Sequence, residues 1–139
     1  MNISKETKIV KVLAPTATGT STINTSVVDM QGYDGVIFLG SIGSAAANNG
    51  MKVQQGAISD GSDAADLAGS LAGGASKTDL LVEVTKPQKR YVRAAVVRGT
   101  TTTIDCVWAI LYRGIKQPVD NSGAAVAQKL LVAPIEGTA

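Results

Sequence analysis

The sequence contains no histidine at all. This absence removes the commonest general base, the usual zinc ligand and any catalytic triad that includes histidine. Cys106 is the only cysteine, so an internal disulfide is impossible and the chain suits a reducing cell interior. Because no basic residue stands beside it in the sequence, we interpret Cys106 as a small buried apolar residue rather than as a reactive thiol.

Aromatic residues are scarce, with one Phe, one Trp and three Tyr. Phe38 and Trp108 stand in apolar stretches that predict core strands, which leaves only Tyr33, Tyr91 and Tyr112 as possible platforms for bases or sugars. The net charge of +2 is too small to indicate nucleic-acid binding by itself. We therefore expect neither a nucleic-acid partner nor a carbohydrate-binding module.

Long hydrophobic runs are also missing. No stretch is long enough for a signal peptide or a transmembrane helix, so we expect a protein that is made and kept in soluble form, without a membrane partner. The 139 residues suffice for one domain with its own core, which needs no metal or disulfide.

Ligand-binding motifs are incomplete. Asp60, Asp63 and Asp66 are spaced by three, whereas an EF-type calcium loop needs oxygen ligands at alternate positions. The glycines of residues 39–44 lack a third glycine, a following helix and a Gly-Lys-Ser sequence, so they do not indicate a phosphate-binding loop. An enzyme would need a carboxylate pair in a cleft, and no evident pair occurs. We predict no metal, no cofactor and no small-molecule substrate.

The most informative region that is present consists of two apolar stretches, residues 89–99 and 104–114, joined by threonines. Both faces of the second stretch are apolar, which predicts a strand in the middle of a broad sheet. We expect the two stretches to form a hairpin with a tight Thr-rich turn. One face of the second stretch holds Ile104, Cys106, Trp108, Ile110 and Tyr112, and the other holds Val107, Ala109 and Leu111.

Shorter patterns predict the remaining strands, including residues 7–13, 36–43 and 79–85. Asn49-Gly50 predicts a turn, and Gly40 inside a predicted strand indicates a bulge or a close backbone approach. Residues 59–76 are expected outside the core, where Asp60 or Ser62 could cap a single helical turn through Leu67. The total of about seven or eight strands predicts an all-β fold, an antiparallel β-sandwich with jelly-roll-like connections.

The two ends differ from the middle. We predict a β-sandwich domain over residues 20–116, an N-terminal arm or edge strand over residues 1–19, and a C-terminal arm over residues 117–139. The C-terminal arm is too apolar for a solvated tail. It either packs back on its own domain, with a short helix over residues 124–131, or it contacts another chain. Its large apolar residues are Val126, Leu130, Leu131, Val132 and Ile135.

Charge is divided along the chain, with an acidic region over residues 53–85 followed by a basic region over residues 86–116. Guanidinium groups pair well with carboxylates at protein interfaces, so we predict protein contact in preference to a solvated sheet edge or nucleic-acid binding. The candidate interface residues are Lys89, Arg90, Arg93, Arg98, Asp60, Asp63 and Asp66, together with Leu130, Leu131, Val132 and Ile135 of the C-terminal arm.

Four phrases of the sequence resemble a group of small virion proteins of tailed bacteriophages. They are GYDGVIF at residues 32–38, SDGSDAADL at 59–67, KRYVRA at 89–94 and AILY at 109–112. The resemblance implies a non-enzymatic decoration or cement protein, often a homotrimer, that is assembled in the host cytoplasm and sits on the capsid surface of the virion. Its implied partner is the major capsid protein, whose capsomers it would bridge. The alternative is a head-to-tail joining (connector) protein or a tail structural protein of the same virion.

These features suggest one mechanism as a hypothesis. The acidic loop of one protomer, residues 60–79, would contact Arg90, Arg93 and Arg98 of the next protomer, while the terminal arms lie across capsid subunits. Many such contacts, each modest, would add up because they are held in a fixed geometry.

Overall fold

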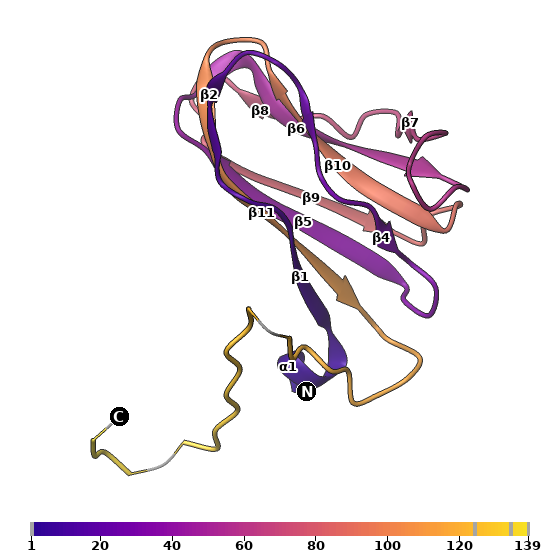
Figure 1. Ribbon diagram of the computed structural model, residues 1–139, viewed down its shortest axis with the longest axis vertical. Helices are drawn as coiled ribbons and strands as arrows, with labels where there is room; N and C mark the ends of the chain where they lie inside the picture. The colour runs from indigo at the N-terminus through magenta and orange to yellow at the C-terminus, as the bar shows by residue number, and fades with distance from the viewer. Residues whose placement is uncertain (1, 124, 134, 139) are drawn as a thin grey trace.

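Two antiparallel sheets face each other in the computed structural model, which describes residues 2–123, 125–133 and 135–138 (Figure 1). Sheet A has the strand order β1-β11-β5-β9, with β2 also paired to β11. Sheet B has the order β3-β10-β6-β7, with β4 paired to β10 and β8 paired to β6. The predicted all-β fold, an antiparallel β-sandwich, is confirmed.

Sheet A contains β1 (Lys8–Leu13), β2 (Thr16–Gly19), β5 (Gly35–Ile42), β9 (Asp79–Thr85) and β11 (Thr102–Tyr112). Sheet B contains β3 (Ile23–Asn24), β4 (Val28–Asp29), β6 (Ala46–Gly56), β7 (Ala65–Asp66), β8 (Ala72–Gly74) and β10 (Tyr91–Arg98). The short helix α1 (Ile3–Glu6) precedes β1.

Consecutive long strands lie in opposite sheets. The connections from β5 to β6, from β9 to β10 and from β10 to β11 each cross from one sheet to the other. Such crossings are compatible with jelly-roll connections, and the jelly-roll assignment itself stays a prediction.

The predicted hairpin of residues 89–114 is wrong. Strand β10 pairs with β6 in sheet B, whereas β11 pairs with β5 in sheet A. The two strands therefore face each other across the core. An alternating apolar pattern fits a hairpin and a crossing equally well, because in both cases one side of each strand points into the same core. The connection also lacks the Asn-Gly or Asp-Gly pair that favours a two-residue hairpin turn.

The predicted turn at Asn49-Gly50 is also wrong, because both residues lie inside β6. Asn49 is buried; its side-chain amide donates to the Ser44 carbonyl at 3.1 Å, and its side-chain oxygen accepts from the Thr100 N–H at 2.8 Å. A Cβ on Gly50 would collide with the Ala72 backbone of the neighbouring strand β8. Glycine here permits a close approach of two strands rather than a turn.

The core lies between the inward faces of the two sheets. Phe38 of β5, Met51 of β6 and Ile104 of β11 are among the largest fully buried side chains. Each such side chain contributes roughly 1.5–3 kcal/mol by leaving water. Gly40 faces Val107 so closely that a Cβ would lie 2.9 Å from a Val107 methyl carbon, which agrees with the close approach expected there.

Strand β11 occupies an inner position in sheet A, as its apolar faces predict, but only one of those faces points into the core. A register shift between Ile104 and Cys106 changes which residues point inward. Beyond it Val107, Ala109 and Leu111 are buried, whereas Trp108 points outward and is 37% exposed. The expectation that Trp108 belongs to the core is therefore wrong, and Cys106, on the same side as Trp108, is only partly buried.

The region of residues 57–76 contains turns and the short strands β7 and β8, so the helical turn expected there is absent from these described residues. Near the N-terminus, β1 and β2 both pair with β11, which makes residues 8–13 and 16–19 part of sheet A. Residues 8–13 and 16–19 are thus edge strands, one of the two alternatives predicted for residues 1–19, and the sandwich extends before the predicted boundary at residue 20.

The chain after β11 first returns to its own domain. The Val119 N–H donates to the Lys5 carbonyl at 2.7 Å, and the Asn121 side chain accepts from the Ile9 N–H at 2.8 Å. The same side chain donates to the carbonyls of Ser4 and Thr7. These bonds fix residues 119–121 beside α1 and β1.

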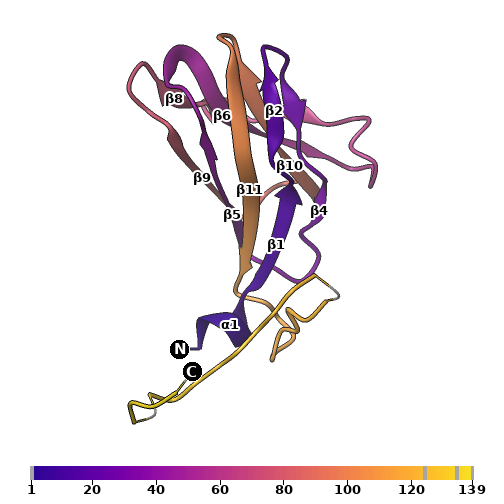
Figure 2. The same cartoon turned by 60° about the vertical axis from the view of Figure 1, so that its left-hand side comes forward.

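The last part of the chain leaves the sandwich (Figures 1 and 2). Residues 125–131 contain no helix, and residue 124 of the expected helix lies outside the described residues. Val126, Leu130 and Leu131 are exposed, and Val132 and Ile135 are 94% and 95% exposed. Packing back on the domain is therefore observed for residues 119–121 but not for these side chains.

Candidate interaction surfaces

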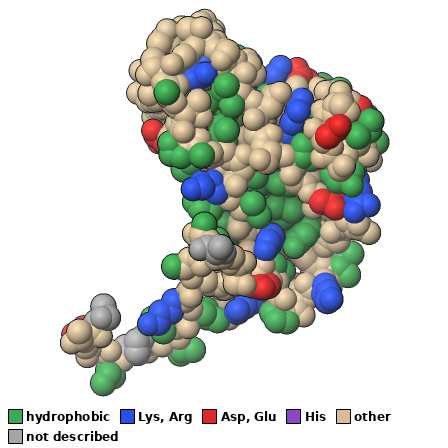
Figure 3. Space-filling model, in the orientation of Figure 1, with side chains coloured by type: hydrophobic (Ala, Val, Ile, Leu, Met, Phe, Trp, Pro, Cys, Tyr) green, Lys and Arg blue, Asp and Glu red, His purple; other side chains and the backbone are tan. Residues whose placement is uncertain are grey.

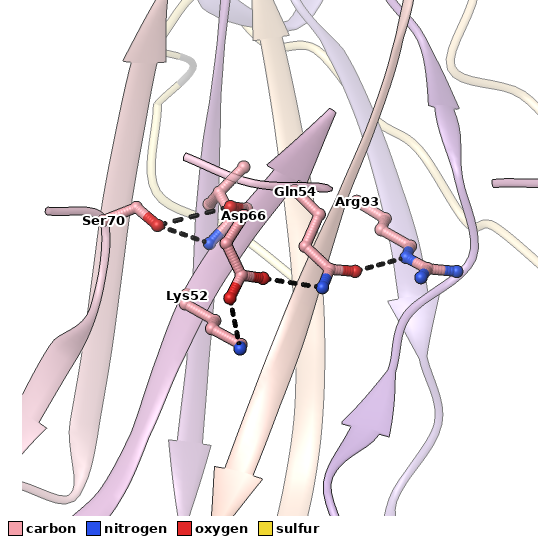
Figure 4. A network of polar contacts seen from close by, with 6 residues as sticks. Lys52, Gln54, Asp66, Ser70 and Arg93 are labelled. Atoms are coloured by element: carbon pink, nitrogen blue, oxygen red, sulfur yellow. Dashed lines mark hydrogen bonds and ion pairs between the residues drawn. The ribbon is translucent and has the colours of Figure 1, made fainter. Parts of the chain in front are cut away.

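The outer face of sheet B carries a polar network (Figure 4). Strand β7 pairs with β6 and brings Asp66 beside Gln54. The Lys52 ammonium lies 2.6 Å from one oxygen of Asp66, and the Gln54 amide donates to the other at 2.7 Å. The Arg93 guanidinium donates to the Gln54 carbonyl oxygen at 2.7 Å. The hydrogen bond from Lys52, and to a smaller extent the one from Gln54, holds the pKa of Asp66 below its ordinary value.

Asp63 lies in the loop between β6 and β7. Its carboxylate accepts the backbone N–H groups of Ala57 at 2.7 Å and Ile58 at 3.1 Å, and these bonds lower its pKa. The Lys89 ammonium lies 4.0 Å from it. Asp60 accepts the Ser62 N–H at 2.8 Å, and hydrogen bonding by Ser62 lowers the pKa of Asp60. Asp60 and Asp63 therefore shape their own loop.

Arg90 forms a two-pronged ion pair with Asp29 of β4. Its Nε and one terminal nitrogen each lie 2.8 Å from a carboxylate oxygen of Asp29. The hydrogen bonds from Arg90 lower the pKa of Asp29, and this geometry is the strongest that arginine and a carboxylate can form. Both side chains remain close to half exposed.

One ion pair, between Lys89 and Asp63, joins the basic and acidic regions of the sequence within one chain. Figure 3 shows acidic and basic side chains interspersed on the visible face. Asp66 and Asp63 have basic neighbours in their own chain, and the expected pairing of one protomer's acidic loop with the next protomer's arginines stays a prediction. Intermolecular roles for Lys89, Arg90 and Arg93 stay predictions.

Arg98 is a clear correction to the predicted interface. Its side chain is only 3% exposed, at the end of β10 where the chain crosses to sheet A. The guanidinium donates to the carbonyls of Ser21 at 2.8 Å, Ala17 at 2.9 Å and Thr102 at 3.1 Å. Arg98 ties the N-terminal strands to the crossing between the sheets and is not available to another protein.

The outer face of sheet A is apolar where the outer face of sheet B is polar. Its strand register aligns two rows of side chains across four strands, from β1 to β9. Leu39 is 41% exposed and Leu81 is 57% exposed. We call these rows the apolar face. One row consists of Lys11, Trp108, Leu39 and Leu81, and the other of Ile9, Ile110, Ile37 and Glu83.

Two shallow grooves extend the apolar face. One, of about 500 Å³, runs between β1 and the start of the C-terminal segment and includes Trp108 and residues 125–128 in its lining. The other, of about 570 Å³, lies between α1 and sheet A and is lined in part by Ile3, Ile37 and Ile110. At its rim the Tyr112 hydroxyl donates to Glu83 at 2.6 Å. The pKa of Tyr112 is raised, mainly by burial of the hydroxyl and secondly by this hydrogen bond.

Neither surface assembles the usual side chains of a metal centre. Among the described residues no group of three or more His, Cys, Asp or Glu side chains comes together to hold a metal ion. In the same part of the chain, no helix is both long and apolar enough to cross a membrane.

Comparison with known proteins gives no match. No family model fits the sequence, and no curated protein and no solved structure is similar to it. The resemblance to bacteriophage virion proteins therefore stays a prediction.

The apolar face could have been inferred from the sequence. In a two-layer sandwich each sheet has only one face against the core, so a strand with two apolar faces needs something besides the opposite sheet to cover the second. Residues 104–112 and 36–42 have this pattern. A central position in sheet A explains why β11 pairs with a strand on each edge. It does not explain why the side of β11 that points away from the core is also apolar.

Proposed function

We propose that this protein is a non-enzymatic structural protein of a bacteriophage virion, a decoration protein that binds the major capsid shell and bridges its capsomers. The sequence phrases described above support the virion context. The observation that carries the shell-binding role is the C-terminal segment, residues 126–138, whose described apolar side chains lie outside a core that is complete without them.

The root of this segment is fixed, which suits it for reaching a neighbouring surface. Val119 and Asn121 hold the chain beside α1 and β1, and the segment then extends away from the sandwich (Figures 2 and 3). Burying each large aliphatic side chain on a shell protein contributes roughly 1.5–3 kcal/mol. Ordering the segment costs about 1–2 kcal/mol per residue. Each arm therefore binds weakly, and many copies on one lattice bind together strongly.

The test uses shells that lack this protein and the purified full-length chain. Co-sedimentation should show binding of the unaltered chain and at least about tenfold weaker binding of a variant with Leu130, Leu131 and Val132 all changed to Ser. The matched control changes the adjacent polar residues Gln128 and Lys129 to Ser and should bind like the unaltered chain.

If the variant with Ser at residues 130–132 binds shells as well as the unaltered chain, the C-terminal segment has no part in the mechanism. Electron microscopy of the particles then tests location. Copies spread over the capsid surface support the proposal, whereas a ring at the head-to-tail junction would indicate the joining protein that the same resemblance allows. Virions without the chain would contradict both roles.

A further inference from the structure

We infer that the apolar face of sheet A is a self-association surface, and that a second copy of this chain covers it with the same face, about a two-fold axis parallel to the strands. This inference goes beyond shell binding and does not depend on it, because it concerns the purified chain alone. The C-terminal segment and the apolar face are separate surfaces with separate tests.

The first reason is the continuity of the face. Trp108, Leu39 and Leu81 are neighbours in one row, and Ile9, Ile110 and Ile37 are neighbours in the next. A contiguous apolar patch of this kind on a soluble domain usually marks an interaction site, whereas single exposed apolar residues do not. The exposed fractions of Leu39, Leu81 and Trp108 leave much of the patch uncovered within the chain.

The second reason is the charge at the two edges. Lys11 lies at the β1 edge beside Trp108, with its ammonium 5.9 Å from the centre of the indole ring. Asp79 and Glu83 lie at the β9 edge, on either side of Leu81 and on the same side of the strand. The face therefore changes from basic through apolar to acidic across the sheet, and these edges complement each other when one copy is turned over.

The two-fold axis follows from this polarity. An axis parallel to the strands places β1 of one copy over β9 of the other, which brings Lys11 toward Glu83 and Asp79. It also places Trp108 over Leu39 and Ile110 over Ile37. An axis across the strands would instead place the acidic β9 edges against each other. Aligned sheets stack about 10 Å apart, a distance that side chains of this size fill.

A second copy of the chain can cover the whole apolar face, whereas the chain's own C-terminal segment does not. In the groove beside Trp108 that segment contributes only residues 126–128, whereas Leu130, Leu131 and Val132 are exposed. Leu39 and Leu81 belong to the far half of the sheet from β1. Two identical faces bury each other in a closed pair, the commonest symmetry of soluble oligomers.

The experiment is sedimentation equilibrium of the full-length chain and of charge-swap variants. The unaltered chain should have the mass of a dimer. Lys11→Glu and Glu83→Lys should each weaken association by about tenfold, since each places like charges across the interface. The double variant should recover most of the lost affinity, because the swapped edges again complement each other. Lys52→Glu, on the outer face of sheet B, is the control and should remain dimeric.

Thermal melting and circular dichroism of each variant establish that it is folded. Leu39→Asp adds a variant that should dissociate the pair even if Glu83→Lys disturbs Tyr112. A monomer at every concentration would overturn the inference, and so would a trimer or failure of the double variant to regain affinity. Dissociation caused by Ser at residues 130–132, with Leu39→Asp still dimeric, would assign the contact to the C-terminal segment and also overturn it.

Discussion

The outer faces of the two sheets differ in polarity: the face of sheet B is polar, and the face of sheet A is apolar. On sheet B, Lys52, Gln54, Asp66 and Arg93 form ion pairs and hydrogen bonds with one another. On sheet A the corresponding surface carries Leu39, and other exposed apolar side chains surround it. A sandwich needs only one apolar face per sheet, so the second apolar face of sheet A supports the proposal that this face contacts another copy of the chain.

The same contrast exists between adjacent residues of one strand. Phe38 points into the core and is fully buried, whereas Leu39 points outward. Phe38→Ala should reduce the free energy of unfolding by about 3–5 kcal/mol, since it removes a large buried side chain and leaves a cavity. Leu39→Ala should reduce it by less than about 1 kcal/mol, measured under conditions where the chain is monomeric. Urea denaturation of both variants makes the comparison.

A large loss of monomer stability in Leu39→Ala would contradict the division into a core face and a contact face. It would show that Leu39 packs within its own chain as a core residue does. Phe38→Ala provides the scale against which such a loss is judged.

The two arginines of β10 provide the next comparison. Arg98→Met should destabilise the chain by roughly 3 kcal/mol, because the carbonyls of Ala17, Ser21 and Thr102 lose a buried charged donor. Arg93→Met should cost less than about 1 kcal/mol, since its bond to Gln54 lies on a solvated face. Chemical denaturation under identical conditions measures both variants, and equal losses would reject the distinct roles given to them.

The smallest predicted effect concerns acid and the polar face of sheet B. Hydrogen bonding by Lys52 and then Gln54 lowers the pKa of Asp66 from its ordinary value of 3.8. A carboxylate with a lowered folded-state pKa contributes stability above the ordinary pKa, and the contribution is lost as the pH falls through the folded value. Thermal midpoints should therefore decrease on acidification below about pH 4.

Asp66→Asn is the matched variant for this acid effect. It should lower stability near neutral pH by less than about 1 kcal/mol, as expected for an exposed pair, and should weaken the dependence on acid. An unchanged acid dependence in Asp66→Asn would assign the effect to other carboxylates, of which Asp29, paired with Arg90, is the first to test.

The sequence was sufficient to predict the sandwich because about seven or eight short strand patterns follow one another with turn signals between them, and no long amphipathic pattern competes. It could not assign strands to sheets. Residues 89–114 have the pattern of a hairpin, yet β10 and β11 lie in different sheets. Asn49-Gly50 has the chemistry of a turn, yet the space beside β8 requires glycine within a strand. Such outcomes depend on contacts between distant segments.

The candidate site was predicted less well for a related reason. Charge counts along the chain cannot show that β7 returns Asp66 to Lys52, or that Arg98 points into the crossing between the sheets. The apolar C-terminal residues were identified because aliphatic side chains are conspicuous outside a strand pattern. The sequence showed that residues 104–112 are apolar on both faces. We explained the second apolar face by a central position in the sheet rather than by a partner.

Trp108 offers the most direct test that the apolar face meets a second copy, because it is the only tryptophan and lies within that face. As the concentration of the purified chain increases, its fluorescence should shift to shorter wavelength and become less accessible to acrylamide, while Leu39→Asp stays accessible throughout. Emission and quenching that do not change with concentration, in a chain that remains monomeric, would contradict the account.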